Sequence, residues 1–228
     1  MRRFFNYLLI GAFGLSIACS TDSEPSISDK EYLPLHKGVY QIYDVDSTWY
    51  APIDGEQTIH YELMTEVVDS FLNVNNQYTY VMYLYKRADA TQSWQYADTW
   101  SARIDNIRAV IAEGNTEYVK FVLPVSEGRE WDGNTFNSLG EDEYELINTR
   151  KPATVDEIVF DDCIEVNQNN DDDPIVRTDI RSEIYARGIG LVRREITILN
   201  FCTVGCNQFG EIETGIIYSQ RIKQFGVQ

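Results

Sequence analysis

The chain has 228 residues, of which 43% are hydrophobic and 13% aromatic, and its formal net charge is -17. A chain of this length and composition favours one or two globular domains with a sizeable core. Its negative field repels nucleic acid and anionic head groups, so we expect no nucleic-acid partner and no capture of lipopolysaccharide by charge.

The first 18 residues have the pattern of a bacterial lipoprotein signal peptide. Arg2 and Arg3 form a positive segment, residues 4–18 are mostly apolar, and Cys19 follows the small residue Ala18. A membrane-spanning helix needs roughly 20 apolar residues, so we interpret the run as a targeting segment. We expect diacylglyceryl and palmitate chains on Cys19, because a single chain holds a protein only marginally. A conventional cleaved signal, with Cys19 unmodified, is the alternative.

The sequence then predicts two further regions. Residues 19–30 are rich in Ser, Asp and Glu, a composition that cannot bury enough apolar surface to offset the cost of ordering. We therefore expect lipidated Cys19 and a flexible acidic tether over 19–30, followed by one β-rich domain over 31–228. The predicted location is the cell outer membrane, with the membrane as partner through the lipid anchor and the domain on the periplasmic side or at the cell surface.

Alternation of apolar and polar residues dominates the rest of the chain. Residues 57–68 place Ile59, Tyr61, Leu63 and Val67 on one face of a half-buried strand. Further strands are predicted over 77–87, 94–104, 107–112, 118–123, 143–147, 158–166, 175–186, 191–199 and 215–222.

We find no helical periodicity after the signal peptide, so the predicted fold is all-β and mainly antiparallel, either a sandwich or a curled sheet that forms a half-barrel. In 175–186 the residues Arg177, Asp179, Arg181 and Glu183 share one face. We interpret this charged face as a solvated sheet surface with cross-strand ion pairs.

Two segments are alike: residues 33–40 and 123–131 both read Leu-Pro-aliphatic, then two residues, Gly and an aromatic ring shortly after. Proline at a strand edge and glycine in a turn can end one strand and start another. Two related halves and a common turn type both explain the repeat, and the turn is the simpler explanation.

These segments, together with 160–166 and with 185–195, resemble an uncharacterised group of secreted lipoproteins of the Bacteroidota. The last segment is the most specific, with a tyrosine, Gly188 and Gly190 around one aliphatic residue, then Leu-Val and charged residues. The group is similar to curved antiparallel-sheet periplasmic lipoproteins, and the resemblance implies that fold and location but no activity. The two glycines themselves predict a sharp bend between strands.

Three cysteines follow Cys19 in a compartment that permits disulfides. We favour a disulfide between Cys202 and Cys206, which Gly205 would allow in a tight loop, over either pairing with Cys163. Cys163 would then be a small buried apolar residue in its strand. No metal is predicted, because no Cys-x-x-Cys pair or neighbouring histidine occurs.

No catalytic motif is evident, and we expect no cofactor. His36 and His60 are predicted to be exposed, and no nucleophile elbow, metalloprotease helix or phosphate-binding loop occurs. Residues 167–174 carry oxygen ligands at alternate positions, but Asp172 and Thr178 depart from a calcium loop. We expect a solvated hairpin loop there.

The leading hypothesis is a non-catalytic cell-envelope lipoprotein, a β-rich binding or scaffold module with an apolar, glycan or protein partner. Trp94, Tyr96 and Trp100 have the same strand parity and are the candidate ligand-binding residues, with a purely core role as the simpler alternative. The alternative function is a hydrolase of envelope material or polysaccharide that uses a carboxylate pair.

Overall fold

A computed structural model describes residues 27–205 and 210–228. Cys19, the signal segment and Cys206 therefore lie outside the described residues. The described elements are one short helix and twelve strands: α1 (Ile27–Lys30), β1 (Val39–Ala51), β2 (Gly55–Leu72), β3 (Tyr78–Arg87), β4 (Gln95–Ile104), β5 (Arg108–Glu113), β6 (Thr116–Val122), β7 (Glu130–Asp132), β8 (Glu143–Val155), β9 (Ile158–Asp173), β10 (Arg177–Ala186), β11 (Gly190–Phe201) and β12 (Ile212–Val227).

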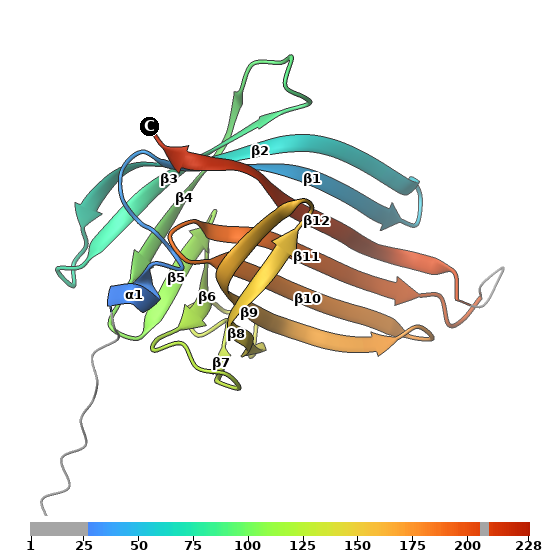
Figure 1. The fold of residues 1–228 in the computed structure, drawn as a ribbon. Coiled ribbons are helices and arrows are strands. Elements are labelled where there is room, and N and C mark those ends of the chain that lie inside the picture. The colour runs from blue at the N-terminus through green and yellow to red at the C-terminus, as the bar shows by residue number, and fades with distance from the viewer. Residues whose placement is uncertain (1–26, 206–209) are drawn as a thin grey trace, which may run out of the picture.

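All twelve strands belong to one antiparallel sheet with the order β6-β5-β4-β3-β2-β1-β12-β11-β10-β9-β8-β7. Each half, β1–β6 and β7–β12, is a meander in which every strand pairs with its neighbour in the chain. The two halves join at the centre, where the first and last strands pair from Val39 opposite Val227 to Tyr50 opposite Gly215. Figure 1 shows this pair between the two halves of the strongly curved sheet.

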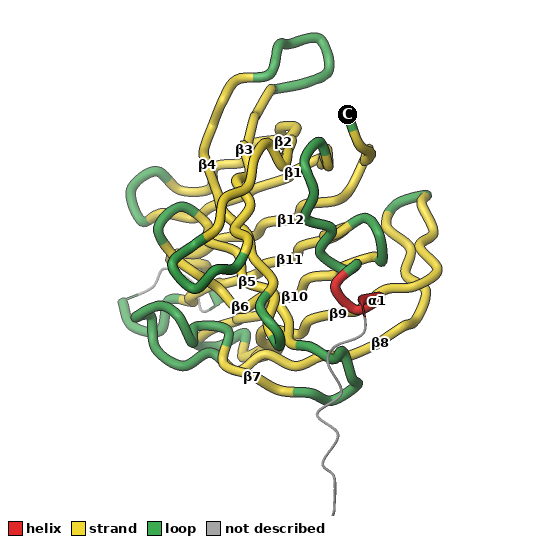
Figure 2. The backbone as a smooth tube through the Cα atoms, turned by 90° about the vertical axis from the view of Figure 1, so that its left-hand side faces the viewer, coloured by secondary structure: helices red, strands yellow, loops and turns green. Residues whose placement is uncertain are grey.

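The sheet curls until its two edges meet. The backbone N–H of Val119 on β6 donates to the carbonyl of Gly133, just after β7, at 2.9 Å. The indole N–H of Trp131 donates to the carbonyl of Val119, also at 2.9 Å. Figure 2 shows the curl from the side. The expected all-β, mainly antiparallel half-barrel is confirmed, and its inner face is the concave face on which the site is built.

The two Leu-Pro segments occupy equivalent places in the two halves. Leu33 precedes β1 and Leu123 precedes β7, and both side chains are buried. Gly38 and Gly128 both have positive φ angles, 89° and 74°. The N–H of each glycine donates to a carbonyl in the following long strand, Val67 in β2 for Gly38 and Leu146 in β8 for Gly128. The repeated motif therefore starts the first strand of each half.

Most strands overlap their predicted positions, and the main differences concern β1, β7, β8 and β9. Strand β8, predicted over 143–147, continues to Val155. Strand β1 was not among the predicted strands, nor was the short β7. Residues 167–173, expected in a hairpin loop, continue β9 and pair with β10, leaving a turn of three residues at 174–176. Asn and Asp favour turns only weakly against a long neighbouring strand that supplies the backbone hydrogen bonds.

The charged side of β10 faces the interior, which corrects the expected solvated surface. Glu183 is 1% exposed and Asp179 is 5% exposed. Glu183 lies opposite Val166 of β9 and Arg194 of β11, so these three side chains share the concave face. Val166 belongs to the main apolar core. Alternation along β10 was predicted correctly, but the face assigned to solvent was wrong. Lys120 and Arg194 on other strands pair with Glu183, and Arg177 and Arg181 on β10 itself pair with Asp179.

The predicted tether ends earlier than expected, because residues 27–30 form α1. Asp29 is 1% exposed; one of its carboxylate oxygens lies 2.7 Å from Arg150, and the other accepts from the N–H of Val125. The hydroxyl of Tyr32, which is fully buried, donates to Asp162. The chain is thus fixed to the sheet as soon as it reaches α1.

Candidate binding site in the concave face

The concave face contains an open groove at the end of the molecule away from α1. Its volume is about 380 Å³. We call it the concave groove and define it by its lining residues, which come from β2, β3, β4, β5, β11 and β12: Tyr61, Leu63, Leu84, Lys86, Ala97, Asp98, Trp100, Glu113, Arg194, Ile196, Ile216 and Tyr218. Most of them are apolar or aromatic, and the polar ones lie mainly toward one side of the sheet, on β3 to β5.

Strand alternation and one bulge decide which aromatic rings reach this groove. On β4, Trp100 lies opposite Met82 and Asp98 lies opposite Leu84, so both point into the concave face. The bulge between Asp98 and Tyr96 shifts the register, and Tyr96 lies opposite Tyr85 on the convex face. An extra residue in one strand reverses the side-chain parity beyond it. The predicted shared face of Tyr96 and Trp100 is therefore wrong.

Trp94, the third predicted ligand-binding residue, lies outside the groove as well. It precedes β4, and the guanidinium of Arg87 lies 4.1 Å from the centre of its ring. Arg87 in turn pairs with Glu62. The structure brings only Trp100 of the three residues to the concave groove, and Tyr96 instead packs edge-to-face with Tyr83 and Tyr85.

A buried charge cluster, Glu113, Lys120, Glu183 and Arg194, forms the polar wall beside the groove. The Nζ of Lys120 lies 2.7 Å from Glu113 and 3.0 Å from Glu183. Arg194 lies 2.7 Å from each of the same two carboxylates. Two cations and two anions thus neutralise each other in the interior, where an unpaired charge would be costly.

The cluster holds both carboxylates ionised. Burial opposes ionisation of Glu113, but Arg194 and Lys120 outweigh it and lower the pKa of Glu113 to about 2. The pKa of Glu183 is also lowered, because the same two cations outweigh desolvation and the repulsion of Glu113. Sequence reasoning did not single out Glu113, Lys120 or Arg194. Lys120 within the apolar run Tyr118–Leu123 was the available signal, since a buried lysine needs a partner.

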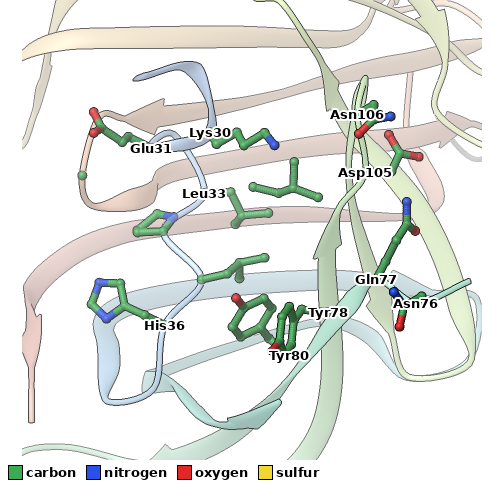
Figure 3. A pocket seen from close by; sticks show the side chains of 14 residues that line it. Lys30, Glu31, Leu33, His36, Asn76, Gln77, Tyr78, Tyr80, Asp105 and Asn106 are labelled. Atoms are coloured by element: carbon green, nitrogen blue, oxygen red, sulfur yellow. The ribbon is translucent and has the colours of Figure 1, made fainter. Parts of the chain in front are cut away.

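A second cavity, of about 660 Å³, opens at the α1 end of the molecule. We call it the mouth cavity; Figure 3 shows it, and its lining residues are 30, 31, 33–36, 76–78, 80, 104–106 and Gly188. Leu33, Pro34 and Leu35 also line a small inner cavity of about 40 Å³. That inner cavity shares Leu63, Trp100 and Arg194 with the concave groove. The first Leu-Pro segment, residues 33–35, thus separates the mouth cavity from the inner cavity and the concave groove.

The bend at Gly188 and Gly190, part of the motif that resembles the lipoprotein group, packs against the N-terminal segment that contains residues 33–35. Gly188 and Gly190 have positive φ angles in the bend between β10 and β11, as predicted. The N–H of Gly188 donates to the carbonyl of Glu31 at 2.8 Å. A Cβ at Gly190 would approach Gln41 and Pro34 to 3.3 and 3.4 Å. The motif therefore serves close backbone packing against the N-terminal segment.

The remaining predicted site residues are placed as follows. His36 and His60 are exposed, as predicted, and His60 lies 2.9 Å from Asp46. Cys163 is a free, buried cysteine, so neither alternative pairing with it is present. Because Cys206 lies outside the described residues, the disulfide between Cys202 and Cys206 stays a prediction, as does the lipidation of Cys19.

Among residues 27–205 and 210–228, no group of three or more His, Cys, Asp or Glu side chains is arranged to hold a metal ion. In the same part of the chain, no helix has the length and apolar character needed to cross a membrane.

No protein-family profile matches the sequence, and no curated protein matches it. Among solved structures, the chain is similar to a Bacteroides fragilis protein described as exported and YmcC-like in fold, with a TM-score of 0.43 and 15% identity over 84% of this chain and 98% of that one. It is also similar to a protein of Parabacteroides distasonis described as a lipoprotein, with a TM-score of 0.40 and 11% identity over 86% and 98% of the two chains.

Proposed function

We propose that the protein is a non-catalytic lipoprotein of the cell envelope whose concave groove binds an amphipathic ligand with an apolar body and an anionic head. The observation that carries this proposal is the composition of the groove. Apolar and aromatic side chains from five strands form a space of about 380 Å³, with Lys86 at its edge. Ligand pockets commonly have this size and this combination of apolar lining and few polar groups.

The groove suits an apolar chain at its floor. Ile196 lies opposite Tyr218 across β11 and β12, and Ile216 lies next along the same face of β12. Leu63, Leu84 and Trp100 face them from the other half of the sheet. Removing a hydrocarbon chain from water contributes about 0.8 kcal/mol for each buried methylene group.

Lys86 supplies the charge for the head group. Its ammonium lies 4.5 Å from the centre of the Tyr61 ring, at the solvent-exposed edge of the groove. Arg194 is held between Glu113 and Glu183, so its charge is already balanced. The formal charge of -17 repels anions in general, so an anionic head would bind only beside this exposed lysine. The two carboxylates of the lining already have partners: Asp98 accepts from the indole of Trp100, and Glu113 pairs with Lys120 and Arg194.

Two features support a non-catalytic role over a carboxylate-pair hydrolase. Glu113 and Glu183 are an acidic pair beside the groove, and each contacts both Lys120 and Arg194. A general acid needs a raised pKa, whereas the pKa values of Glu113 and Glu183 are both lowered. Attachment would be through lipid chains on Cys19, which would hold the groove near the outer membrane.

The proposal is tested by titrating the full-chain protein with dodecanoate below its micelle concentration, using isothermal calorimetry. We expect saturable binding at one site. Ile216→Glu should weaken binding at least tenfold by placing a carboxylate in the groove, whereas the matched variant Ile217→Glu, on the convex face of the same strand, should bind normally.

Lys86→Gln should weaken dodecanoate binding but leave binding of the uncharged analogue dodecanol unchanged. Failure of the native protein to bind dodecanoate would overturn the proposal. Equal effects of Ile216→Glu and Ile217→Glu would also overturn it, because they would place any binding outside the groove.

A further inference from the structure

The mouth cavity has a lining unlike that of the concave groove. Tyr78 and Tyr80 point into it from β3, with ring centres 6.3 Å apart and planes tilted by 40°. Tyr78 is 59% exposed, which is unusual for a large ring on the inner face of a curved sheet. Figure 3 shows Gln77 and Asn106 on the wall opposite His36 of the N-terminal segment.

We propose that the mouth cavity is a second ligand site, which binds a neutral oligosaccharide. The two tilted tyrosine rings offer successive apolar faces on which the C–H faces of two adjacent sugar rings can stack. The side-chain amides of Asn76, Gln77 and Asn106 each carry donors and an acceptor, which matches the hydroxyl groups at the edge of a sugar. The volume of about 660 Å³ lies within the range of small-molecule sites.

The charges around the mouth cavity favour a neutral ligand. Asp105 is already held by Arg108, with Nε 3.1 Å from Oδ2, and by the backbone N–H groups of residues 107 and 108. Glu31 lies 3.6 Å from Arg187. Lys30 remains close to the opening as a hydrogen-bond donor. Both carboxylates of the lining are thus paired with an arginine of the protein, so neither calls for a cationic ligand.

Residues 33–35 separate the mouth cavity from the concave groove, so a ligand in one does not contact a ligand in the other. Leu33 is 6% exposed and belongs to the main core, so it is a fixed partition between the mouth cavity and the inner cavity. Tyr32 and Gly188 fix the backbone on one side of that partition. A sugar in the mouth cavity would therefore leave dodecanoate binding in the groove unchanged.

Saturation-transfer NMR with maltotriose, cellotriose and triacetylchitotriose, each added separately to the full-chain protein, tests the proposal. We expect transfer to the ring protons of at least one trisaccharide. Tyr78→Ala should weaken that binding about fivefold through loss of stacking. Tyr96→Ala is the matched control, because Tyr96 is 61% exposed but lies on the convex face.

Gln77→Leu should also weaken binding, by removing a donor and an acceptor from the wall of the cavity. Absence of transfer to all three trisaccharides would overturn the proposal, as would equal loss in Tyr78→Ala and Tyr96→Ala. Competition between the bound trisaccharide and dodecanoate would contradict two separate sites. Because the dodecanoate titration is a separate measurement, failure of the sugar site leaves the groove proposal standing, and the reverse also holds.

Discussion

The ammonium of Lys120 on β6 lies 3.0 Å from the carboxylate of Glu183 on β10, although seven strands separate β6 from β10 in the sheet order. The contact therefore crosses the interior and does not follow the sheet. Phe121 and Tyr185, beside these residues, pack with ring centres 5.2 Å apart. An ion pair and an aromatic pair together connect the two walls of the half-barrel.

Replacing Lys120 by methionine should destabilise the protein by about 3 kcal/mol, because Glu113 and Glu183 would lose a shared cation in the interior. The free energy of unfolding in urea measures this loss. Lys151→Met is the control: Lys151 and its partner Glu127 are each 55% exposed, so its effect should stay below about 1 kcal/mol. Similar losses in the two variants would contradict a connecting role for Lys120.

The stability of the protein should fall in acid because of the same cluster. The pKa of Glu113 is lowered from 4.5 to about 2 on folding. The stabilisation is therefore complete above the unfolded pKa and is lost as the pH falls from about 4.5 toward 2. Unfolding free energies between pH 6 and pH 2 should decline less steeply in Glu113→Gln than in the native protein. Glu157→Gln, in the exposed turn between β8 and β9, should keep the native slope.

Removing the hydroxyl of Tyr32 should loosen the attachment of the N-terminal segment. This hydroxyl donates to Asp162 and accepts from Arg187 at 2.9 Å. Tyr32→Phe should cost about 2 kcal/mol, as expected for hydrogen bonds to charged groups. Tyr96→Phe, which loses an exposed hydrogen bond to Thr99, should cost less than about 0.5 kcal/mol. If Tyr32→Phe and Tyr96→Phe unfold at the same urea concentration, the Tyr32 contacts do not stabilise the fold.

Cys163 should resist alkylation while the protein is folded. Its side chain is buried, and burial raises the pKa of the thiol to about 11, so little thiolate is present at pH 8. Iodoacetamide should label Cys163 slowly in buffer and rapidly in about 8 M urea, which unfolds most small proteins. Peptide mass analysis measures the labelling. Rapid labelling of the folded protein would contradict the burial of the Cys163 side chain.

Alternation along the chain was enough to predict the class of fold and most strands. Strand β1 was missed although its signal is present: Tyr43 and Val45 face the core, while Asp44 and Asp46 between them face the convex surface. That the two edge strands, β6 and β7, lie next to each other was not predictable from the sequence. The contact of Val119 with Gly133 depends on how far the whole sheet curls.

The candidate sites were harder to predict than the fold. Period-two alternation separates two faces of a strand but does not say which one is buried, and this caused the error for Glu183. The bulge next to Tyr96 is a single extra residue that reverses parity, and no Gly or Pro marks it. Both sites also combine residues from distant strands, which only the complete sheet brings together.

The pairing of β1 with β12 at the centre of the sheet has a consequence for the order in which the sheet assembles. Val39 and Val227 are partners, so the full central ladder forms only after β12 has been synthesised. Each meander can assemble locally beforehand, but the contacts that join the two halves have the greatest sequence separation and should form last.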